Sequence, residues 1–435
     1  MVAVFLLFVV GAMAALSIDA VTLYTARSEA QLAADAAALA AARVLANSGA
    51  TSDTTGTLLT NVEDPSSGAA KAVAVQVAEQ NRVGGAPLTS ANVTAVTFGG
   101  STTNPTVTVR VQVTTLPAFF ARIWGTTQFT VAASATAEAY NPSSVSGISS
   151  TNPPVAPICV KPWLLPNIDP SNPPNAILVA ATGTPAPTAT GLLGWETPPP
   201  APGAIRLRSN CAGTGSCSTA DGPNVWRYYP GTTDPLTGDF PAPSNSSVAC
   251  CTGLGFINYQ LSVAGCVQTP VACNQKVNVD TTPDLVRDIE TGAAVNGMTH
   301  SSSSGAGDSV DTSPASPPGG TSPFQFVAGT ENPVVLSGAL TAPANVVVSD
   351  SLVTVPIIDT ATWPPTSTTF PQVQIIGFLQ LFLDPDGNPA DLTGQIRTRV
   401  INIVGCGDGP GGAGVPPILG NGASPVAVRL INPTP

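Results

Sequence analysis

The first eighteen residues, MVAVFLLFVVGAMAALSI, contain no charged side chain. As a helix they would be about 27 Å long, close to the ~30 Å thickness of the hydrocarbon core of a bilayer. Helix-forming residues continue from Asp19 to Ala46 with no proline or glycine among them. We therefore expect one long helix over residues 1–47, in which a transmembrane segment runs directly into an alanine-rich segment.

A cleaved signal peptide is the alternative interpretation of the apolar segment. The small residues of Ala12–Ala14 match the pattern that a signal peptidase accepts. Against cleavage, the helix pattern crosses that position without a breaker. The first basic residue is Arg27, so the positive-inside rule indicates the orientation only weakly.

The long helix has two apolar faces. Leu32, Leu39 and Leu45 lie on one side and could meet the protein's own sheet. Small residues let another helix approach closely, and this is one interpretation of the second face. The alternative is that the second face packs only within its own domain, since alanine is also the best helix former. Its members repeat with steps of three and four: Leu16, Ala20, Leu23, Ala30, Ala34, Ala37, Ala41 and Val44.

Two polar side chains follow the apolar segment. A carboxylate near the hydrocarbon region is costly unless it finds a partner, so Asp19 is either an assembly contact or a marker of the membrane edge. Tyr24 is compatible with a position at the membrane interface.

The composition limits the remaining possibilities. The chain has 435 residues, which suggests two or three domains. Only 9% of the residues are charged, and 41 glycines and 44 prolines interrupt regular structure, so turns should be frequent. The net charge is −11, and the 15 lysines and arginines are scattered singly, which excludes the basic surface that nucleic acids require.

Three segments follow the long helix, and together they predict an α+β fold. Residues 48–140 combine one helix pattern with three strand patterns and predict a small α/β module. Residues 141–157 are rich in Pro and Ser and indicate a linker. Residues 158–435 predict an exported, β-rich and loop-rich domain. Its clearest strands are expected at 332–340, 345–358, 371–384 and 394–405, the last two as a hairpin.

All eight cysteines lie in this last segment, downstream of the apolar segment that would export it. An even number of cysteines in an exported region favours disulfides, among roughly a hundred possible pairings. Short spacing makes Cys211 with Cys217, and Cys266 with Cys273, plausible pairs. The candidates are Cys159, Cys211, Cys217, Cys250, Cys251, Cys266, Cys273 and Cys406.

Catalytic and cofactor sites are not expected. The only histidine, His300, has no G-x-S-x-G motif beside it and lies in a Ser- and Gly-rich stretch, contrary to the geometry that catalysis requires. The carboxylates of Asp384–Asp391 fit a hairpin turn better than a calcium loop. No cysteine spacing provides the paired thiolates of a zinc site. We therefore expect no metal, organic cofactor or small-molecule substrate, and a protein that is not an enzyme.

The segment ALSIDAVTLYTARSEAQLAADAAALAAA, residues 15–42, resembles the N-terminal signature of TadE/TadG-like proteins of tight-adherence (Flp) pilus systems. The family also continues with a second helix, strands, a Phe-Phe segment and a final strand of small residues. Residues 69–82, 91–98, 105–115, 116–125 and 126–139 fit that order. The resemblance implies that certain helix positions contact the membrane or other assembly proteins. These are Asp19, Tyr24, Arg27, Gln31, Leu32, Asp35 and Leu39.

Two family features are missing. Prepilin-like relatives carry a glutamate five residues after the cleaved residue, but Leu16 stands at that place after Gly11, so prepilin processing is not expected. Some relatives carry a von Willebrand A domain with an Asp-x-Ser-x-Ser metal site. The segments that begin at Asp169 and Asp311 lack the second serine, so we expect no such site.

The resemblance implies a single-pass protein of the bacterial cell membrane, with most of the chain extracytoplasmic. It implies a non-enzymatic role in Flp pilus assembly or surface display, with the membrane and other Tad/Flp proteins as partners. An exported adhesin or binding protein that uses the same anchor outside a pilus system is the alternative. A secreted enzyme dependent on His300 is the third.

Overall fold

The computed structural model divides the chain into two compact units, one of residues 1–45, 62–139 and 428–435 and one of residues 46–61 and 140–427. The described residues are 2–53, 56–64, 68–144, 153–170, 177–180, 183–186, 193, 205–209, 225–233, 238–241, 258–280, 285–300, 305–310, 325–359, 372–383, 396–407, 417–419 and 424–431.

The predicted long helix is confirmed as α1, Val2–Asn47. It has no internal proline, and helix formers fill its alanine-rich part. Among the described residues, no helix has the combination of length and apolar character that is needed to cross a membrane.

The first unit is built on a sheet with strand order β18-β5-β4-β3. Its strands are β3 (Val93–Gly100), β4 (Pro105–Pro117), β5 (Gln128–Tyr140) and β18 (Ala427–Ile431). The first three confirm the strand patterns of the sequence and pair antiparallel in chain order. The sequence pattern does not predict β18, which pairs beside β5 in the sheet.

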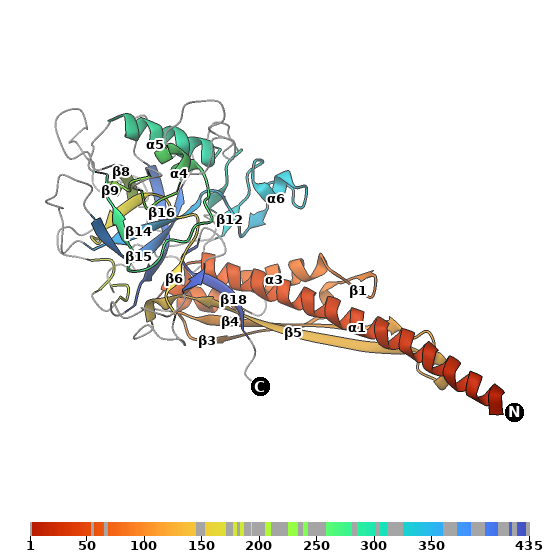
Figure 1. The fold of residues 1–435 in the computed structure, drawn as a ribbon. Coiled ribbons are helices and arrows are strands. Elements are labelled where there is room, and N and C mark those ends of the chain that lie inside the picture. The colour runs from red at the N-terminus through yellow and green to blue at the C-terminus, as the bar shows by residue number, and fades with distance from the viewer. Residues whose placement is uncertain are drawn as a thin grey trace. The chain divides into compact units, whose positions relative to one another are not determined.

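The buried face of this sheet places valines beside alanines. The buried valines of β4 lie opposite small residues of β5, as in the pairs Val109–Ala135 and Val111–Ala133. Figure 1 shows α1 and α3 (Ala69–Glu79) on the same side of the sheet. The side chain of Gln31 on α1 donates a hydrogen bond to the carbonyl oxygen of Ser134 on β5, which fixes α1 over the alanine strand.

The alanines of α1 are the side chains that this packing buries. Residues 26, 30, 33, 34, 37, 38, 41 and 42 are all fully buried alanines. The expectation that the leucine face would meet the sheet is wrong for Leu32, which is 65% exposed, although Leu45 is buried. The members of the small-residue stripe from Ala30 to Val44 are covered within the chain, which supports the alternative in which this part packs inside its own domain, whereas Leu16 and Ala20 are exposed. Alanine opposite alanine lets helix and sheet approach closely.

The second unit contains a seven-stranded sheet with strand order β10-β15-β14-β7-β9-β8-β16 in the described residues. Strands β15 and β16 also pair, so the sheet closes into a ring that β10 extends. Most pairs are antiparallel, but β14 with β7 and β8 with β9 are parallel. The strands are β7 (Trp163–Pro166), β8 (Ile205–Ser209), β9 (Val225–Pro230), β10 (Lys276–Asn278), β14 (Leu352–Ile358), β15 (Gln372–Leu383) and β16 (Ile396–Gly405).

Two hydrophobic clusters cover this sheet. The larger contains Trp163, Leu381 and Ile403 from its strands together with Tyr259 of α4 and Val295 of α5. In the smaller cluster, Phe326 of β12 stacks on Phe382 of β15 with ring centroids 5.2 Å apart. Alternate residues of β15 therefore serve opposite faces, as expected of a strand buried on both sides. The further elements are α4 (Asn258–Ala264), α5 (Leu285–Met298), β11 (Ser309–Val310), β12 (Phe326–Val327) and β13 (Asn345–Val346).

The remaining elements are short. They are η1 (Ala50–Ser52), α2 (Thr57–Val62), β1 (Arg82–Val83), β2 (Ala86–Pro87), η2 (Ser90–Asn92), η3 (Ala121–Trp124), η4 (Pro142–Ser144), β6 (Val155–Ala156), α6 (Pro333–Leu336) and β17 (Ile418–Leu419).

The structure confirms the α+β class and the β-rich, disulfide-bonded domain, and it corrects one detail. The strand expected at 332–340 is wrong, because Asn332 caps a helical turn by accepting a hydrogen bond from the N–H of Val334, and Pro333 occupies the first helical position. The interpretation of 141–157 as a linker stays a prediction, although some of its described residues are buried. Asn141, Ser143 and Val155 are buried, and residues 145–152 lie outside the described residues.

The close packing of α1 on β5 predicts that Ala30 tolerates no larger side chain. We expect Ala30→Leu to lower the free energy of unfolding by about 1–3 kcal/mol, because added methylenes overpack a close contact. Ala20→Leu, at an exposed position of the same helix, is the matched control. Urea unfolding followed by circular dichroism measures both, and equal stability of the two variants would contradict the close contact.

Candidate functional site

Asp19 is the strongest candidate position on α1. It is the only charged residue among the first 26 residues, yet it is 2% exposed. The backbone N–H of Phe119 donates to its Oδ1 at 3.0 Å. The N–H groups of Phe120 and Ala121 donate to its Oδ2 at 3.0 and 2.7 Å. We call this set of three hydrogen bonds the Asp19 clamp.

The chain has a local reason to offer these three donors. Strand β4 ends at Pro117, and the helical turn η3 begins at Ala121, so the intervening N–H groups have no strand partner. The first N–H groups of a helical turn also lack an acceptor within it. Buried backbone donors must be paired, and the Asp19 carboxylate supplies the acceptors.

The hydrogen bonds keep Asp19 ionised. Burial raises the pKa of its carboxyl, but the hydrogen bonds from Ala121, Phe119 and Phe120 together outweigh burial, so the pKa lies below its ordinary value. The stabilisation by the clamp is therefore present above the ordinary carboxyl pKa and is lost as the pH falls through the lowered value.

Other polar residues of α1 also bind backbone atoms. Glu29 accepts a hydrogen bond from the N–H of Gly84 at 2.7 Å. Gln31 donates to the Ser134 carbonyl oxygen at 3.2 Å and to the Asp35 carboxylate at 2.8 Å. These contacts fix the rotation and the axial position of the helix within the first unit.

The remaining predicted helix positions do not gather around Asp19. Tyr24 is 79% exposed, and Arg27 and Leu32 are also exposed. Leu39 is half-buried. The outer face of α1 therefore presents Tyr24 and Leu32, while the inner face holds Asp19 and the alanines.

In the second unit, a buried amide network receives the end of α1. The side chain of Asn402 donates to the carbonyl oxygen of Ala46 at 2.6 Å and to Oε1 of Gln380 at 2.5 Å. Gln380 in turn donates to Oδ1 of Asn47 at 2.9 Å. The last carbonyls of a helix have no partner within it, so this network satisfies a helix end that the core would otherwise leave unpaired.

Two disulfides lie in the second unit, Cys159–Cys266 and Cys273–Cys406. The expectation that Cys266 pairs with Cys273 is wrong, because each is joined to a cysteine more than a hundred residues away in sequence. Short spacing was a poor guide because the segment that holds both cysteines is hydrogen-bonded to Val155 and Cys159 on one side and to Ile375 of β15 on the other. The other four candidates, Cys211, Cys217, Cys250 and Cys251, lie outside the described residues.

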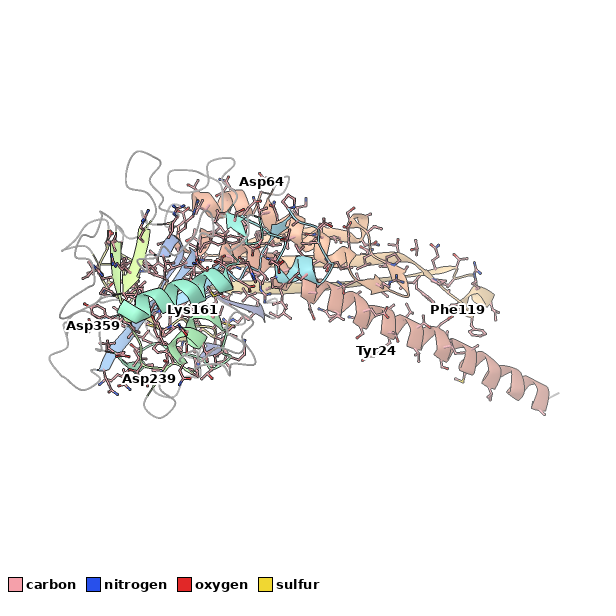
Figure 2. All side chains as sticks on the ribbon, turned by 90° about the horizontal axis from the view of Figure 1, so that it is seen from above. Tyr24, Asp64, Phe119, Lys161, Asp239 and Asp359 are labelled. Atoms are coloured by element: carbon pink, nitrogen blue, oxygen red, sulfur yellow. A yellow bond between two sulfur atoms is a disulfide. The ribbon has the colours of Figure 1, made fainter. Side chains whose placement is uncertain are left out.

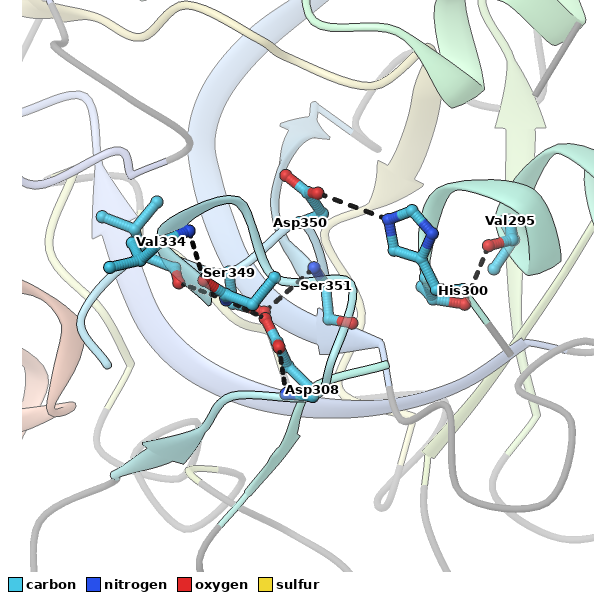
Figure 3. Close-up of polar contacts among 11 residues, drawn as sticks. Val295, His300, Asp308, Val334, Ser349, Asp350 and Ser351 are labelled. Atoms are coloured by element: carbon cyan, nitrogen blue, oxygen red, sulfur yellow. Dashed lines mark hydrogen bonds and ion pairs between the residues drawn. The ribbon is translucent and has the colours of Figure 1, made fainter. Parts of the chain in front are cut away.

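His300 has a specific neighbour. Its Nε2 lies 3.6 Å from Oδ2 of Asp350, and Figure 3 shows the two side chains pointing toward each other. Partial burial raises the pKa of Asp350, while His300 acts in the opposite direction. His300 also has a positive φ of 54°, at the end of the turn after α5. Residues 301–304 lie outside the described residues, as does the predicted turn at Asp384–Asp391.

Lys161 is the most buried cation near this pair, at 4% exposure. Burial lowers its pKa to about 8, although the charge of Asp350 acts in the opposite direction. A lysine with a lowered pKa can act as a nucleophile. Here its Nζ donates a hydrogen bond to the carbonyl oxygen of Gly265 at 2.8 Å, next to Cys266, which indicates a structural role beside the disulfide.

No group of three or more His, Cys, Asp or Glu side chains in the described part of the chain could hold a metal ion. Asp169 is buried in that part, whereas Asp311 lies outside it, so the absence of a von Willebrand-type site stays a prediction.

Residues 1–44 match the Tad family model, described as Flp pilus-assembly TadE/G-like. The match includes Asp19 and the other six predicted helix positions, which confirms the resemblance of this segment. The likeness of residues 45–140 to the family stays a prediction. The chain matches no curated protein and no solved structure significantly.

The Asp19 clamp predicts that Asp19→Ala exposes the turn after β4. We expect amide hydrogen exchange of Phe119, Phe120 and Ala121 to accelerate roughly tenfold or more, because hydrogen bonds to a charged acceptor are the strong kind. Asp35→Ala, which removes a carboxylate bound only to a side chain, is the control and should leave these amides protected. Unchanged exchange in Asp19→Ala would show that the clamp does not hold the turn.

The lowered pKa of Lys161 predicts how the free energy of unfolding depends on pH. Between its folded pKa of about 8 and its ordinary value of 10.5, the unfolded chain binds more protons than the folded chain, so stability rises with pH. The rise should be on the order of 3 kcal/mol in total. Lys161→Met should abolish it, whereas Lys276→Met, at an exposed position of β10, should retain it. Urea unfolding from pH 7.5 to 10.5 checks this, and equal slopes in both variants would refute it.

Proposed function

We propose, from the match of residues 1–44 to the TadE/G-like family model, that the chain is a non-enzymatic, membrane-anchored component of tight-adherence (Flp) pilus assembly or surface display. The family match is the observation that carries the proposal. The matched segment contains Asp19, and the Asp19 carboxylate is bound by three backbone N–H groups of the same unit. The match therefore includes a charged residue that has a defined structural role.

The membrane anchor in this proposal is the segment of residues 1–18. It contains no charged residue, and its helical length is close to the thickness of a bilayer core. We propose that it holds the chain in the bacterial cell membrane as a single-pass protein. The first exposed charged side chain along α1 is Arg27, well after the segment ends.

The remainder of the chain would then be extracytoplasmic. Two disulfides support this side of the membrane, because such bonds form and persist in oxidising compartments. They join segments 107 and 133 residues apart and thereby restrict the unfolded chain over most of the second unit.

The proposed role is one of positioning and not of chemistry. On α1, the inward polar side chains bind backbone groups of the first unit, so a contact made by the outer face of the helix is transmitted to a fixed module. The outer face carries Tyr24 and Leu32, and we propose that it meets other Tad/Flp proteins.

The test is deletion of the gene in its own bacterium, with surface pili counted by electron microscopy and attachment measured in parallel. We expect deletion to abolish both, and the full chain to restore both. Asp19→Ala should fail to restore them, because the helix would lose its fixed position, whereas Asp35→Ala should succeed. The full chain should also stay in the membrane pellet after carbonate extraction.

Each alternative gives a different result in this experiment. Lost attachment with normal pili would favour the adhesin that uses the same anchor outside a pilus system. Release of the chain from the membrane pellet by carbonate would contradict the proposed membrane anchor. Pili and attachment unaffected by deletion would overturn the proposal as a whole.

A further inference from the structure

The turn between β4 and β5 exposes large apolar side chains at the end of the first unit. We call residues 118–127 the β4–β5 turn. In it Phe119 is 58% exposed and Ile123 is 71% exposed. Isolated exposed apolar residues are common, but two on one short turn leave a concentrated apolar surface in water.

This turn is an ordered structure. Ala118 donates its N–H to the carbonyl oxygen of Thr127, and Thr126 donates to that of Ala121. Ile123 donates to the carbonyl oxygen of Phe120 at 3.0 Å. The Asp19 clamp adds three further hydrogen bonds. The exposure of Phe119 and Ile123 is therefore built into a hydrogen-bonded turn.

The clamp also aligns the turn with the apolar part of α1. Phe119 is bonded through its backbone to Asp19, the residue that directly follows the uncharged segment 1–18. Figure 2 shows Phe119 at the end of the hairpin beside α1. On α1, the exposed apolar side chains around this level are Val10, Met13, Leu16, Ile18 and Val21. Exposed apolar side chains thus lie both on the helix and on the turn.

The exposed charged side chains closest in sequence to the β4–β5 turn and to the uncharged segment of α1 are positive. Between residues 111 and 137 the only charged residue is Arg122, which is exposed, and on α1 the first exposed charge is Arg27. Asp19, the carboxylate that binds the turn, is buried in the clamp, and the next carboxylate on α1, Glu29, accepts a hydrogen bond from the N–H of Gly84. Guanidinium groups bind phosphate in a bidentate geometry, and long basic side chains reach from an apolar boundary to headgroups.

The small apolar area of the β4–β5 turn also favours lipid, and not a protein, as its binding partner. A specific protein interface buries about 800 Å² on each partner. Two side chains flanking an arginine on one short turn provide far less than this. Insertion into a membrane interface, in contrast, requires only an apolar projection with basic residues beside it.

We propose that the β4–β5 turn enters the headgroup region of the membrane in which residues 1–18 are anchored, an inference that rests on the proposed anchor. Phe119 and Ile123 reach the boundary of the acyl chains, and Arg122 binds anionic lipid phosphate. The first unit then meets the membrane at two points, the helix and the turn. Two points restrict its tilt, which a single helix would leave free.

The test uses the full chain with a photoreactive phenylalanine analogue at position 119, 123 or 32. The chain is reconstituted in vesicles of phosphatidylglycerol and phosphatidylethanolamine, and adducts are identified by mass spectrometry. We expect lipid adducts at 119 and 123. Position 32 is equally exposed and apolar but lies about 20 Å further along the helix from Asp19, and should give none above background.

Lipid composition tests the role of Arg122. Replacing phosphatidylglycerol with phosphatidylcholine should lower the adduct yield at position 119, and Arg122→Gln should remove that dependence. A yield equal in both vesicle types would overturn the assignment of Arg122 to anionic phosphate.

The outcomes separate this inference from the anchor. Retention of the chain in vesicles without lipid adducts at 119 and 123 would overturn the insertion of the turn and leave the anchor intact. Adducts to a second protein copy at 119 would also overturn it. A chain that does not stay with the vesicles would overturn the anchor and this inference together.

Discussion

Asp19 is the only charged residue among the first 26 residues, and its carboxylate must either face water or find donors, because an unpaired buried charge is too costly to keep. Asp19 finds three backbone N–H groups in a segment a hundred residues later in the chain. The donors are available because a strand ends and a helical turn begins there, which leaves them without local partners. The carboxylate therefore gains donors and the N–H groups gain acceptors, so neither is left buried without a hydrogen bond. The contact joins α1 to the far end of its sheet.

The same logic extends along the helix. Asp19, Glu29 and Gln31 all bind backbone atoms of the first unit. Between and beyond these contacts the buried side chains of α1 are mostly alanine, as are the buried side chains of β5. Small side chains give little specificity in packing, since they lack shapes that interlock. The polar contacts supply what the alanines cannot, a defined rotation and axial position of the helix.

Periodicity predicted α1, α3 and the strands β3, β4 and β5 of the first unit because their helix and strand patterns are regular, but it did not predict β18. It could not predict that the partner of Asp19 is a set of backbone N–H groups, since backbone donors leave no mark in the residue types. A sharper signal was present, namely a single charge among the first 26 residues of the helix and a Phe-Phe segment followed by Gly125. In the second unit, sequence spacing predicted a disulfide between Cys266 and Cys273 that does not form. Each cysteine pairs with a distant one, because a closed sheet brings distant segments together.

The amide network at the end of α1 limits how far the family resemblance extends. The matched residues 1–44 all belong to the first unit, and the second unit begins at Ala46, whose carbonyl oxygen is bound by Asn402. From that residue onward, the helix end is paired with amides of β15 and β16 that lie outside the matched segment. A role inferred from the family therefore describes only the matched part of the helix, residues 1–44. What the second unit recognises has to be argued from its own residues, because the match ends where its contacts start.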